Sequence, residues 1–173
     1  MVKTGFLPGP PAEDAPAAHA TGSPSELVQT ATLTRNAAGH FECRWVYLRP
    51  QSDSVCVFTR GLDDLIYCPV AHGEGRFELA AAADLPRLRA AGQIALTYVD
   101  AAGAPAAGAY PLNPNGSLAD IAGVCDGTGT ILGLMPHPED HLSPMQHPTA
   151  ARGAVGQFGL ALFANGIRYA AGL

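Results

Sequence analysis

The sequence is poor in charge, in aromatic residues and in long apolar runs. Asp, Glu, Lys and Arg make up 14% of its 173 residues, and Phe, Trp and Tyr make up 7%. The ten Lys and Arg are scattered and outnumbered by fifteen Asp and Glu, for a formal net charge of −5. Because a nucleic-acid backbone is bound by clustered cations, we expect no nucleic-acid partner. No run approaches the ~18 apolar residues of a membrane span, and the first residues lack a signal-peptide core, which predicts a cytoplasmic protein without a membrane partner.

The four cysteines form no CxxC pair and have no regular spacing, which argues against a disulfide framework or a zinc knuckle. Cys43, Cys56 and Cys68 lie in apolar runs, where we expect buried free thiols. Cys125 stands in G-V-C-D-G, which mimics the elbow of a nucleophilic cysteine. Such an elbow opens a helix, whereas DGTGTILGLM predicts a turn into another strand. We therefore interpret Cys125 as a residue at the end of a strand.

Apolar patterning predicts a chain built mainly of strands. Residues 8–25 are rich in Pro, Ala, Gly and Ser without a period and are expected to form a flexible loop. Alternating or continuous apolar runs predict strands over 26–34, 41–48, 54–58, 65–70, 94–99 and 130–135. The strand at 41–48 places four residues on one face: Phe41, Cys43, Trp45 and Tyr47. A further strand ends at Cys125, and Asp126-Gly127 turns it into the strand at 130–135 as a hairpin.

Two helices are expected. ADLPRLRAAG, residues 83–92, has Asp84 as a candidate N-cap and Pro86 in its first turn. A second helix is predicted from about Ala154, with one apolar face packed on the domain: Val155, Phe158, Leu162, Phe163 and Ile167. Strands and helices together predict an α/β fold in a single domain, with a mixed sheet and the C-terminal helix as its cover.

The sharpest local feature is Met135-Pro-His137-Pro-Glu139, which follows an apolar strand. Residues at the carboxyl ends of strands in α/β sheets line the crevice where ligands bind. Prolines on both sides of His137 impose an extended exit, in which residues two apart project to the same side. Glu139 then accepts a hydrogen bond from one imidazole nitrogen and leaves the other to take a proton, as in the orienting and basic residues of a nucleophilic triad. A loop histidine beside a solvated glutamate is the alternative.

A metal site is a second interpretation of the same region. Zinc prefers histidine and carboxylate ligands, and four candidates lie within eleven residues: His137, Glu139, His141 and His147. Histidines four apart suit a helical face, but Pro138 and Pro144 argue against a helix. We therefore expect no metal here.

Three segments carry a resemblance to a known family. YPLNPNGSLADIAGVCDGTGTILGLMPHPED, residues 110–140, resembles the C-terminal part of the glutaminase domain of phosphoribosylformylglycinamidine synthase, a class I glutamine amidotransferase of purine biosynthesis. TLTRNAAGHFECRWVYL and PVAHGEGRF resemble two other signatures of this family in the same order. The combination of NPNGS, HGEG and MPHPE selects this enzyme among amidotransferases.

The resemblance implies the C-terminal part of a flavodoxin-like class I amidotransferase fold. It implies glutamine as the substrate, hydrolysed to glutamate and ammonia, and a synthetase subunit or domain as the partner. That partner would use ATP and Mg to aminate formylglycinamide ribonucleotide, so no cofactor is expected in this domain. His137 and Glu139 match the family's general base and the residue that orients it. His72 and Gly73, in His72-Gly73-Glu74-Gly75, match a segment near the glutamine pocket.

The family's nucleophile, a Cys in a G-x-C-N-G elbow that opens a helix, has no match. Residues 1–9, MVKTGFLPG, resemble the end of that helix, so the nucleophilic Cys is expected upstream of Met1. The chain is then a truncated, partial glutaminase domain over residues 1–173. A general base without its nucleophile cannot form the thioester, and strands without partners have open edges. We expect the chain alone to be inactive and poorly soluble or partly unfolded.

Two other hypotheses stay open. In the first, the chain is a non-catalytic interaction or regulatory module that keeps the amidotransferase fold without the nucleophile. In the second, Cys125 is the nucleophile of an unrelated hydrolase with His137 as its base. The second requires the Cys125 sulfur within about 4 Å of the His137 ring.

Overall fold

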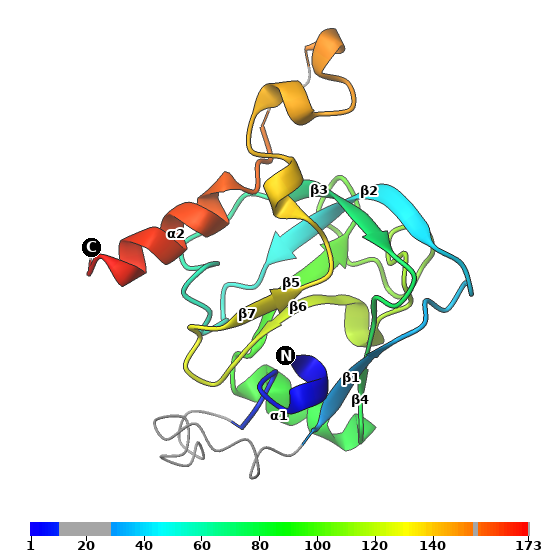
Figure 1. The fold of residues 1–173 in the computed structure, drawn as a ribbon, viewed down its shortest axis with the longest axis vertical. Helices are drawn as coiled ribbons and strands as arrows, with labels where there is room; N and C mark the ends of the chain where they lie inside the picture. The colour runs from blue at the N-terminus through cyan, green and yellow to red at the C-terminus, as the bar shows by residue number, and fades with distance from the viewer. Residues whose placement is uncertain (11–28, 154–155, 173) are drawn as a thin grey trace.

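The computed structural model of the protein describes residues 1–10, 29–153 and 156–172. Its strands are β1 Ala31–Thr34, β2 Glu42–Pro50, β3 Ile66–His72, β4 Arg76–Leu79, β5 Ile94–Val99, β6 Ile121–Cys125 and β7 Leu132–Leu134. A five-stranded sheet has the order β3-β2-β5-β6-β7, and β1 pairs with β4 in a separate ribbon. Every strand pair within the described ranges is antiparallel. The curled sheet, with helix α2 (Leu160–Ala170) beside it, confirms the expected α/β fold (Figure 1).

Two apolar clusters form the core. Buried residues of the first include Val46, Leu48, Tyr98 and Leu162, which joins α2 to the sheet. The second cluster includes Leu7, Phe77, Leu88, Ile121 and Val124. Leu88 comes from α1, Leu85–Ala90, the short helix that the sequence predicts at 83–92. The α1 helix connects β4 of the two-stranded ribbon to β5 of the five-stranded sheet. It is therefore not a crossover between two strands of the same sheet.

Most predicted strands are present. The runs at 41–48, 65–70 and 94–99 form β2, β3 and β5, and the last has the predicted bounds. The predicted hairpin is confirmed, because β6 and β7 pair antiparallel with Cys125 opposite Leu132. The run at 26–34 forms a strand only over Ala31–Thr34, and its first three residues lie outside the described residues. One further strand, β4, was not predicted and follows the HGEG motif directly.

The prediction of a strand over 54–58 is wrong. The Val55 N–H donates to the Gly92 carbonyl at 2.9 Å, and the Val57 N–H donates to the Gly129 carbonyl at 2.9 Å. Alternate amides therefore bond to two separate loops and not to one strand. Cys56 between them is fully buried. The apolar run reflects burial of an irregular segment, which periodicity alone does not distinguish from a buried strand.

The loop predicted at 8–25 is only partly described, since residues 11–28 lie outside the described residues. Of its first residues, Pro8 and Gly9 are buried. The Gln93 side-chain amide donates to the Pro8 carbonyl at 2.5 Å and to the Gly9 carbonyl at 3.4 Å. Before them, a 3-10 turn over Val2–Thr4 ends at Gly5 in the left-handed conformation, with φ of 80°. A glycine in this conformation is a common end of a helical turn.

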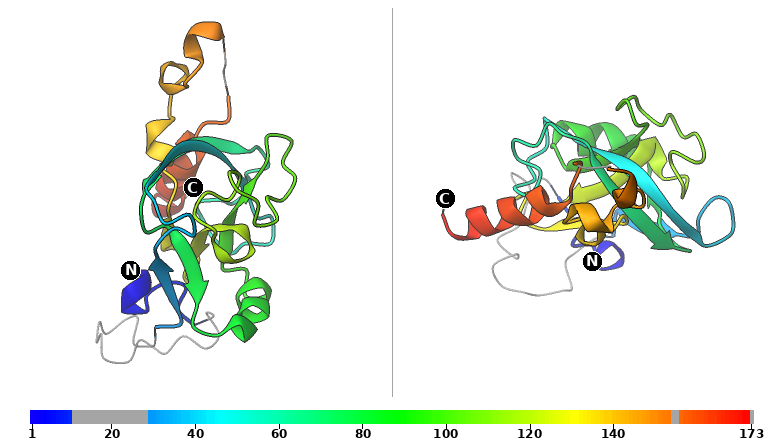
Figure 2. Two further views of the ribbon diagram at one scale, coloured as in Figure 1. Left: turned by 90° about the vertical axis from the view of Figure 1, so that its right-hand side faces the viewer. Right: turned by 90° about the horizontal axis from the view of Figure 1, so that it is seen from above.

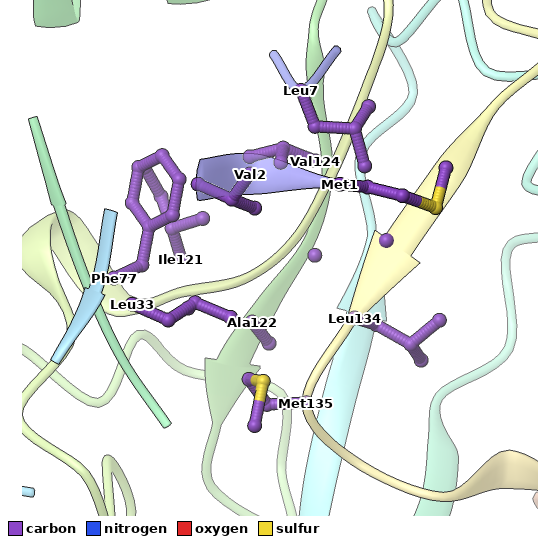
Figure 3. A pocket seen from close by; sticks show the side chains of 12 residues that line it. Met1, Val2, Leu7, Leu33, Phe77, Ile121, Ala122, Val124, Leu134 and Met135 are labelled. Atoms are coloured by element: carbon purple, nitrogen blue, oxygen red, sulfur yellow. The ribbon is translucent and has the colours of Figure 1, made fainter. Parts of the chain in front are cut away.

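The N-terminal turn covers one side of an apolar cavity of about 180 Å³ (Figure 3). Val2 and Leu7 face it from the turn, and Ile121 and Val124 face it from β6. Leu134 of β7 lines another wall. The labelled side chains are all apolar, so this cavity contributes packing space and no acid–base chemistry.

One face of β2 carries the four residues expected there, but that face points outward. Phe41 and Cys43 are exposed, whereas the alternate residues Val46 and Leu48 are buried. The prediction of a buried Cys43 is therefore wrong, while Cys56 and Cys68 are buried free thiols as expected. The burial of the other face decides the register, because successive side chains of a strand point to opposite sides.

The C-terminal helix begins at Leu160, later than predicted, and the predicted positions 154 and 155 lie outside the described residues. Of its expected apolar face, Leu162 is 3% exposed, but Ile167 is 70% exposed. Phe163 is also exposed. The helix therefore packs through a narrow contact and leaves apolar side chains in solvent. No helix among the described residues is long and apolar enough to span a membrane.

This exposure makes a prediction about solubility. Ile167→Ser is expected to lower aggregation and dye binding to apolar surface, because it removes an exposed apolar side chain without opening a cavity. Leu162→Ser, one turn earlier, is expected to destabilise the fold by about 2–5 kcal/mol, because it empties a core position. Light scattering and urea unfolding of both variants measure the two effects. Equal loss of stability in both variants would contradict the helix packing described above.

Candidate active site

His137 and Glu139 form a hydrogen-bonded pair where the chain leaves β7. His137 Nδ1 lies 2.8 Å from Glu139 Oε1. The side chains are 40% and 53% exposed, so the pair is open to solvent on one side. The His137 N–H donates to the Pro69 carbonyl of β3 at 2.8 Å, which anchors the segment to the far edge of the sheet. A 3-10 turn over Pro138–Asp140 then brings Glu139 to the ring. The predicted contact is therefore present, but the expected extended exit is wrong, because a 3-10 turn begins directly after His137.

A cavity of about 380 Å³ adjoins this pair. Its other walls are apolar: Phe58, Leu132, Leu134, Pro136, Pro138, Leu162 and Phe163. Because Glu139 occupies Nδ1, the opposite ring nitrogen of His137 is left to exchange a proton. An imidazole base beside a small apolar cavity suits proton transfer to and from a nucleophile placed in that cavity.

None of the four cysteines, all of which the structure describes, lines this cavity. Cys68 is influenced electrostatically by Glu139 of the His137–Glu139 pair, which we call the dyad. Burial, with smaller effects of the Glu139 and Asp140 charges, raises the pKa of the Cys68 thiol far above its ordinary value. Cys68 therefore stays a neutral, buried thiol, which is a poor nucleophile.

Cys125 lies at the turn end of the β6–β7 hairpin, whereas His137 follows its open end. Cys125 pairs with Leu132, while the Met135 N–H bonds to the Ala122 carbonyl three residues before Cys125. At about 3.3 Å per residue, Cys125 lies ~10 Å along the strand from Met135, which still precedes His137. The Cys125 sulfur instead contacts the Gly92 carbonyl at 3.9 Å. The hypothesis of a Cys125–His137 hydrolase is therefore wrong.

The other motifs meet in a cluster of three loops, which we call the loop cluster: residues 36–40, 72–75 and 113–117. The Asn36 N–H donates to the Gly73 carbonyl at 2.9 Å, and the Ala37 N–H donates to the Asn115 carbonyl at 3.0 Å. The Asn115 side-chain amide donates to the Gly75 carbonyl at 2.7 Å and to the Tyr98 hydroxyl at 3.0 Å. Segments far apart in the sequence are therefore tied into one polar structure.

His72 is buried in the loop cluster beside Asn36. Its Nδ1 lies 3.2 Å from Asn36 Oδ1. Burial lowers the pKa of His72, and the His137 ring adds a smaller effect in the same direction. The two histidines are therefore electrostatic neighbours, although they belong to different motifs. Gly73 lies next to Phe41, whose ring is 3.9 Å from where a Cβ of Gly73 would stand. The roles of Asn36 and Asn115 were not predicted, although both residues lie in family motifs.

The two remaining histidines of the metal hypothesis lie in a projecting arm of 3-10 turns, residues 138–152 (Figure 2). The His141 and His147 rings have centroids 5.3 Å apart and pack against Trp45 and Tyr67. His141 Nδ1 lies 2.6 Å from the Tyr67 carbonyl. Within the described residues, no group of three or more His, Cys, Asp or Glu is placed to hold a metal ion.

Comparison with known proteins identifies the class to which this fold and dyad belong. Residues 1–170 match the CobB/CobQ-like glutamine amidotransferase domain, and the chain belongs to that family. Its sequence is PurQ-like: it is 47% identical over 145 residues to phosphoribosylformylglycinamidine synthase subunit PurQ of Treponema denticola, covering 82% of this chain and 52% of the relative. The PurQ subunit of Dehalococcoides mccartyi is 41% identical over 172 residues, covering 98% and 59%.

A solved structure agrees. The structure of PurLQS from Thermotoga maritima matches with a TM-score of 0.56 and 28% identity, covering 84% of this chain and 55% of that chain. The family resemblance expected from the motifs is thereby confirmed. The chain spans about half the length of the curated relatives that it matches.

Proposed function

We propose that this chain carries the acid–base half of a PurQ-type glutaminase site. His137 is the general base, Glu139 orients it, and glutamine is the substrate. The observation that carries the proposal is the 2.8 Å contact between His137 Nδ1 and Glu139 Oε1 beside an apolar cavity. The contact holds the ring in one orientation and stabilises the imidazolium that forms when the base takes a proton.

The nucleophile in this proposal is a cysteine outside the 173 residues. It enters the cavity beside His137, gives its proton to the ring and attacks the carboxamide carbon of glutamine. The protonated ring then returns the proton to the departing nitrogen, which leaves as ammonia, and water later releases glutamate from the thioester. His72 and Gly73 of the loop cluster contribute to the glutamine pocket.

The partner in this proposal is an ATP- and Mg-dependent synthetase in the cytoplasm, which takes the ammonia to aminate formylglycinamide ribonucleotide. The chain itself needs no cofactor, because both proton transfers involve side chains only. Residues 1–173 act as a partial domain. The relatives' printed name, phosphoribosylformylglycinamidine synthase subunit, supports this partner, as does the PurLQS assembly in the solved structure.

A second candidate is a non-catalytic module that keeps the amidotransferase fold. One observation favours it, namely that none of the chain's cysteines lines the cavity at His137. The two candidates predict different results when a nucleophilic cysteine is supplied: only the first predicts that glutamate is then released from glutamine.

The test is an extended protein, in which the part of the Dehalococcoides mccartyi relative that lies outside the match is fused to this chain. Glutamate release from glutamine by the extended protein, with its cognate synthetase present, supports the proposal. Replacing the elbow cysteine of the added part with Ala is the control and should abolish release. A folded extended protein that binds the synthetase but releases no glutamate would favour the non-catalytic module.

Glu139→Gln in the extended protein is expected to lower kcat for glutamine hydrolysis by about 10–100-fold. The amide keeps the shape of the side chain but loses the charge that stabilises the imidazolium, and it permits the wrong tautomer. Asp140→Asn, the neighbouring acid, is the control and should leave kcat within about twofold. Steady-state glutamate release measures both, and equal effects of the two variants would contradict the role of Glu139.

A further inference from the structure

Two buried cysteines that the proposed mechanism does not use, Cys56 and Cys125, meet in the core. Both are 0% exposed and belong to the first apolar cluster. Cys56 lies in the irregular segment over 54–58, and Cys125 ends β6. Ser54 Oγ contacts both residues, since it accepts the Cys56 N–H at 3.3 Å and lies 4.0 Å from the Cys125 sulfur. The fold therefore brings two free thiols from distant segments into one small group.

The two thiols differ in chemical character. The Cys125 thiol donates a hydrogen bond to the Cys56 sulfur, which is the main reason that the pKa of Cys56 is lowered to about 7. Burial opposes this effect, and the Phe58 and Thr59 N–H groups add smaller effects that lower the pKa further. The same hydrogen bond, together with burial, raises the pKa of Cys125 far above its ordinary value. Cys56 therefore has thiolate character near neutral pH, and Cys125 is its protonated neighbour.

Cys56 lies in a segment that is suited to local opening. Val55, the residue before it, is exposed. The amides on either side of Cys56 bond to two separate loops and not to a strand. Segments held in this way open at a lower free energy than the strands of a core sheet, so a small oxidant reaches them without unfolding of the whole chain. Cys68, the third buried cysteine, lies instead in β3, where it pairs with Val46 of β2.

Residues beside both cysteines line the cavity at His137. Phe58 follows Cys56 by two positions, and Leu132 lies directly opposite Cys125 in the β6–β7 hairpin. Both of these apolar residues line the cavity. Because a covalent bond is much shorter than a hydrogen-bonded contact between two sulfur atoms, linking the thiols draws the two segments together. A bond between Cys56 and Cys125 therefore changes the shape of this cavity.

We propose that Cys56 and Cys125 form a reversible redox pair that closes to a disulfide and reshapes the cavity at His137. The oxidant is hydrogen peroxide. The Cys56 thiolate attacks one peroxide oxygen, the O–O bond breaks, and the departing hydroxide takes up a proton as water. This step leaves Cys56 as a sulfenic acid.

Cys125 completes the reaction. Its sulfur attacks the Cys56 sulfur, the S–S bond forms as the S–O bond breaks, and the departing hydroxide leaves with the Cys125 proton as water. The peroxide gains the two electrons that the two thiols lose. A thiol reductant reverses the change by thiol–disulfide exchange.

The test treats the full chain carrying Cys43→Ser with hydrogen peroxide, because removal of the exposed cysteine prevents links between molecules. The remaining thiols are alkylated in denaturant, and the peptides are mapped without reductant. We expect a link between Cys56 and Cys125 that a thiol reductant removes. Both thiols should be lost at least about tenfold faster than Cys68, a neutral thiol of the same apolar cluster. Unfolding of the whole chain would expose all three equally, so this difference identifies a reaction of the folded chain.

Cys125→Ala in the same background is expected to leave Cys56 as a sulfenic acid that dimedone traps, because no second thiol remains to form the disulfide. Cys68→Ala is the matched control, since it removes another fully buried thiol of the same cluster, and it should keep the link. Mapping of the chain that carries only Cys43→Ser needs neither variant, so a folding defect in either one leaves the test intact.

The His137 ring reports on the cavity. Its NMR resonances, assigned by comparison with His137→Ala, are expected to shift when the disulfide forms and to return when it is reduced. The His147 ring belongs to the projecting arm and does not line the cavity, so its resonances are the control and should not move.

A link to Cys68, or loss of the Cys56 and Cys125 thiols no faster than that of Cys68, would overturn the redox pair. A disulfide that leaves the His137 resonances in place would overturn its effect on the cavity. Neither measurement uses catalysis, so the outcome is independent of whether the extended protein is a glutaminase.

Discussion

Glutamine-dependent amination by the extended protein and its synthetase is expected to fall by ~10³-fold or more when His137 is replaced by Ala, because the nucleophile then has no base. Amination with added ammonium salt should remain within about twofold of the parent, because that reaction bypasses glutamine hydrolysis. The contrast between the two nitrogen sources separates loss of a catalytic base from loss of the fold. Product formation with each source measures it.

His147→Ala provides the control for this substitution. His147 belongs to the projecting arm, packs against Tyr67 and does not line the cavity. The His147→Ala variant should keep both glutamine- and ammonia-dependent activity. Loss of both activities with His137→Ala would mean that the His137 side chain is needed for the fold. Retention of the glutamine-dependent activity would exclude His137 as the base.

The 173-residue chain alone is expected to release no glutamate from glutamine above the uncatalysed rate. Three of the four cysteines are buried, namely Cys56, Cys68 and Cys125. The fourth, Cys43, is exposed on the outer face of β2. The Cys68 thiol, the one under the influence of Glu139, is held neutral by burial. An imidazole without a nucleophile in its cavity has nothing to activate except water, which attacks a carboxamide far more slowly than a thiolate does.

A coupled assay for glutamate measures this second prediction, and the extended protein serves as the positive control. Turnover by the chain alone that a thiol-directed glutamine analogue inhibits would show that one of its own cysteines is the nucleophile. Peptide mapping of the modified cysteine would then identify it. That result would require a rearrangement of β6 or β2, because no cysteine lines the cavity at His137.

Local patterning was informative for strands of the five-stranded sheet. The runs that form β2, β3 and β5 alternate or repeat apolar residues clearly, and β6 and β7 form the predicted hairpin, although a loop over residues 126–131 joins them and its left-handed residue is Gly129 and not Gly127. Patterning was misleading where a segment is buried for a reason other than strand pairing. The apolar run at 54–58 is buried between two loops, and an apolar residue carries no record of whether its backbone bonds to a strand or to a turn. Patterning also does not say how much of an apolar face meets the core, and so it predicted neither the outward Cys43 nor the exposed Ile167.

The sequence by itself determined the family and the dyad, because MPHPE, HGEG and NPNGS are contiguous motifs and because His137 and Glu139 lie two residues apart. Residues so close in the sequence stay within reach of each other, although the contact forms across a 3-10 turn and not in the extended chain that the prolines predicted. Only the tertiary structure decided that Cys125 lies away from His137, that Asn36 contacts the His72 ring, and that Glu42 pairs with His72 across β2 and β3. These relations join residues separated by dozens of positions, and the sheet register and the packing of loops, which no local pattern specifies, bring them together.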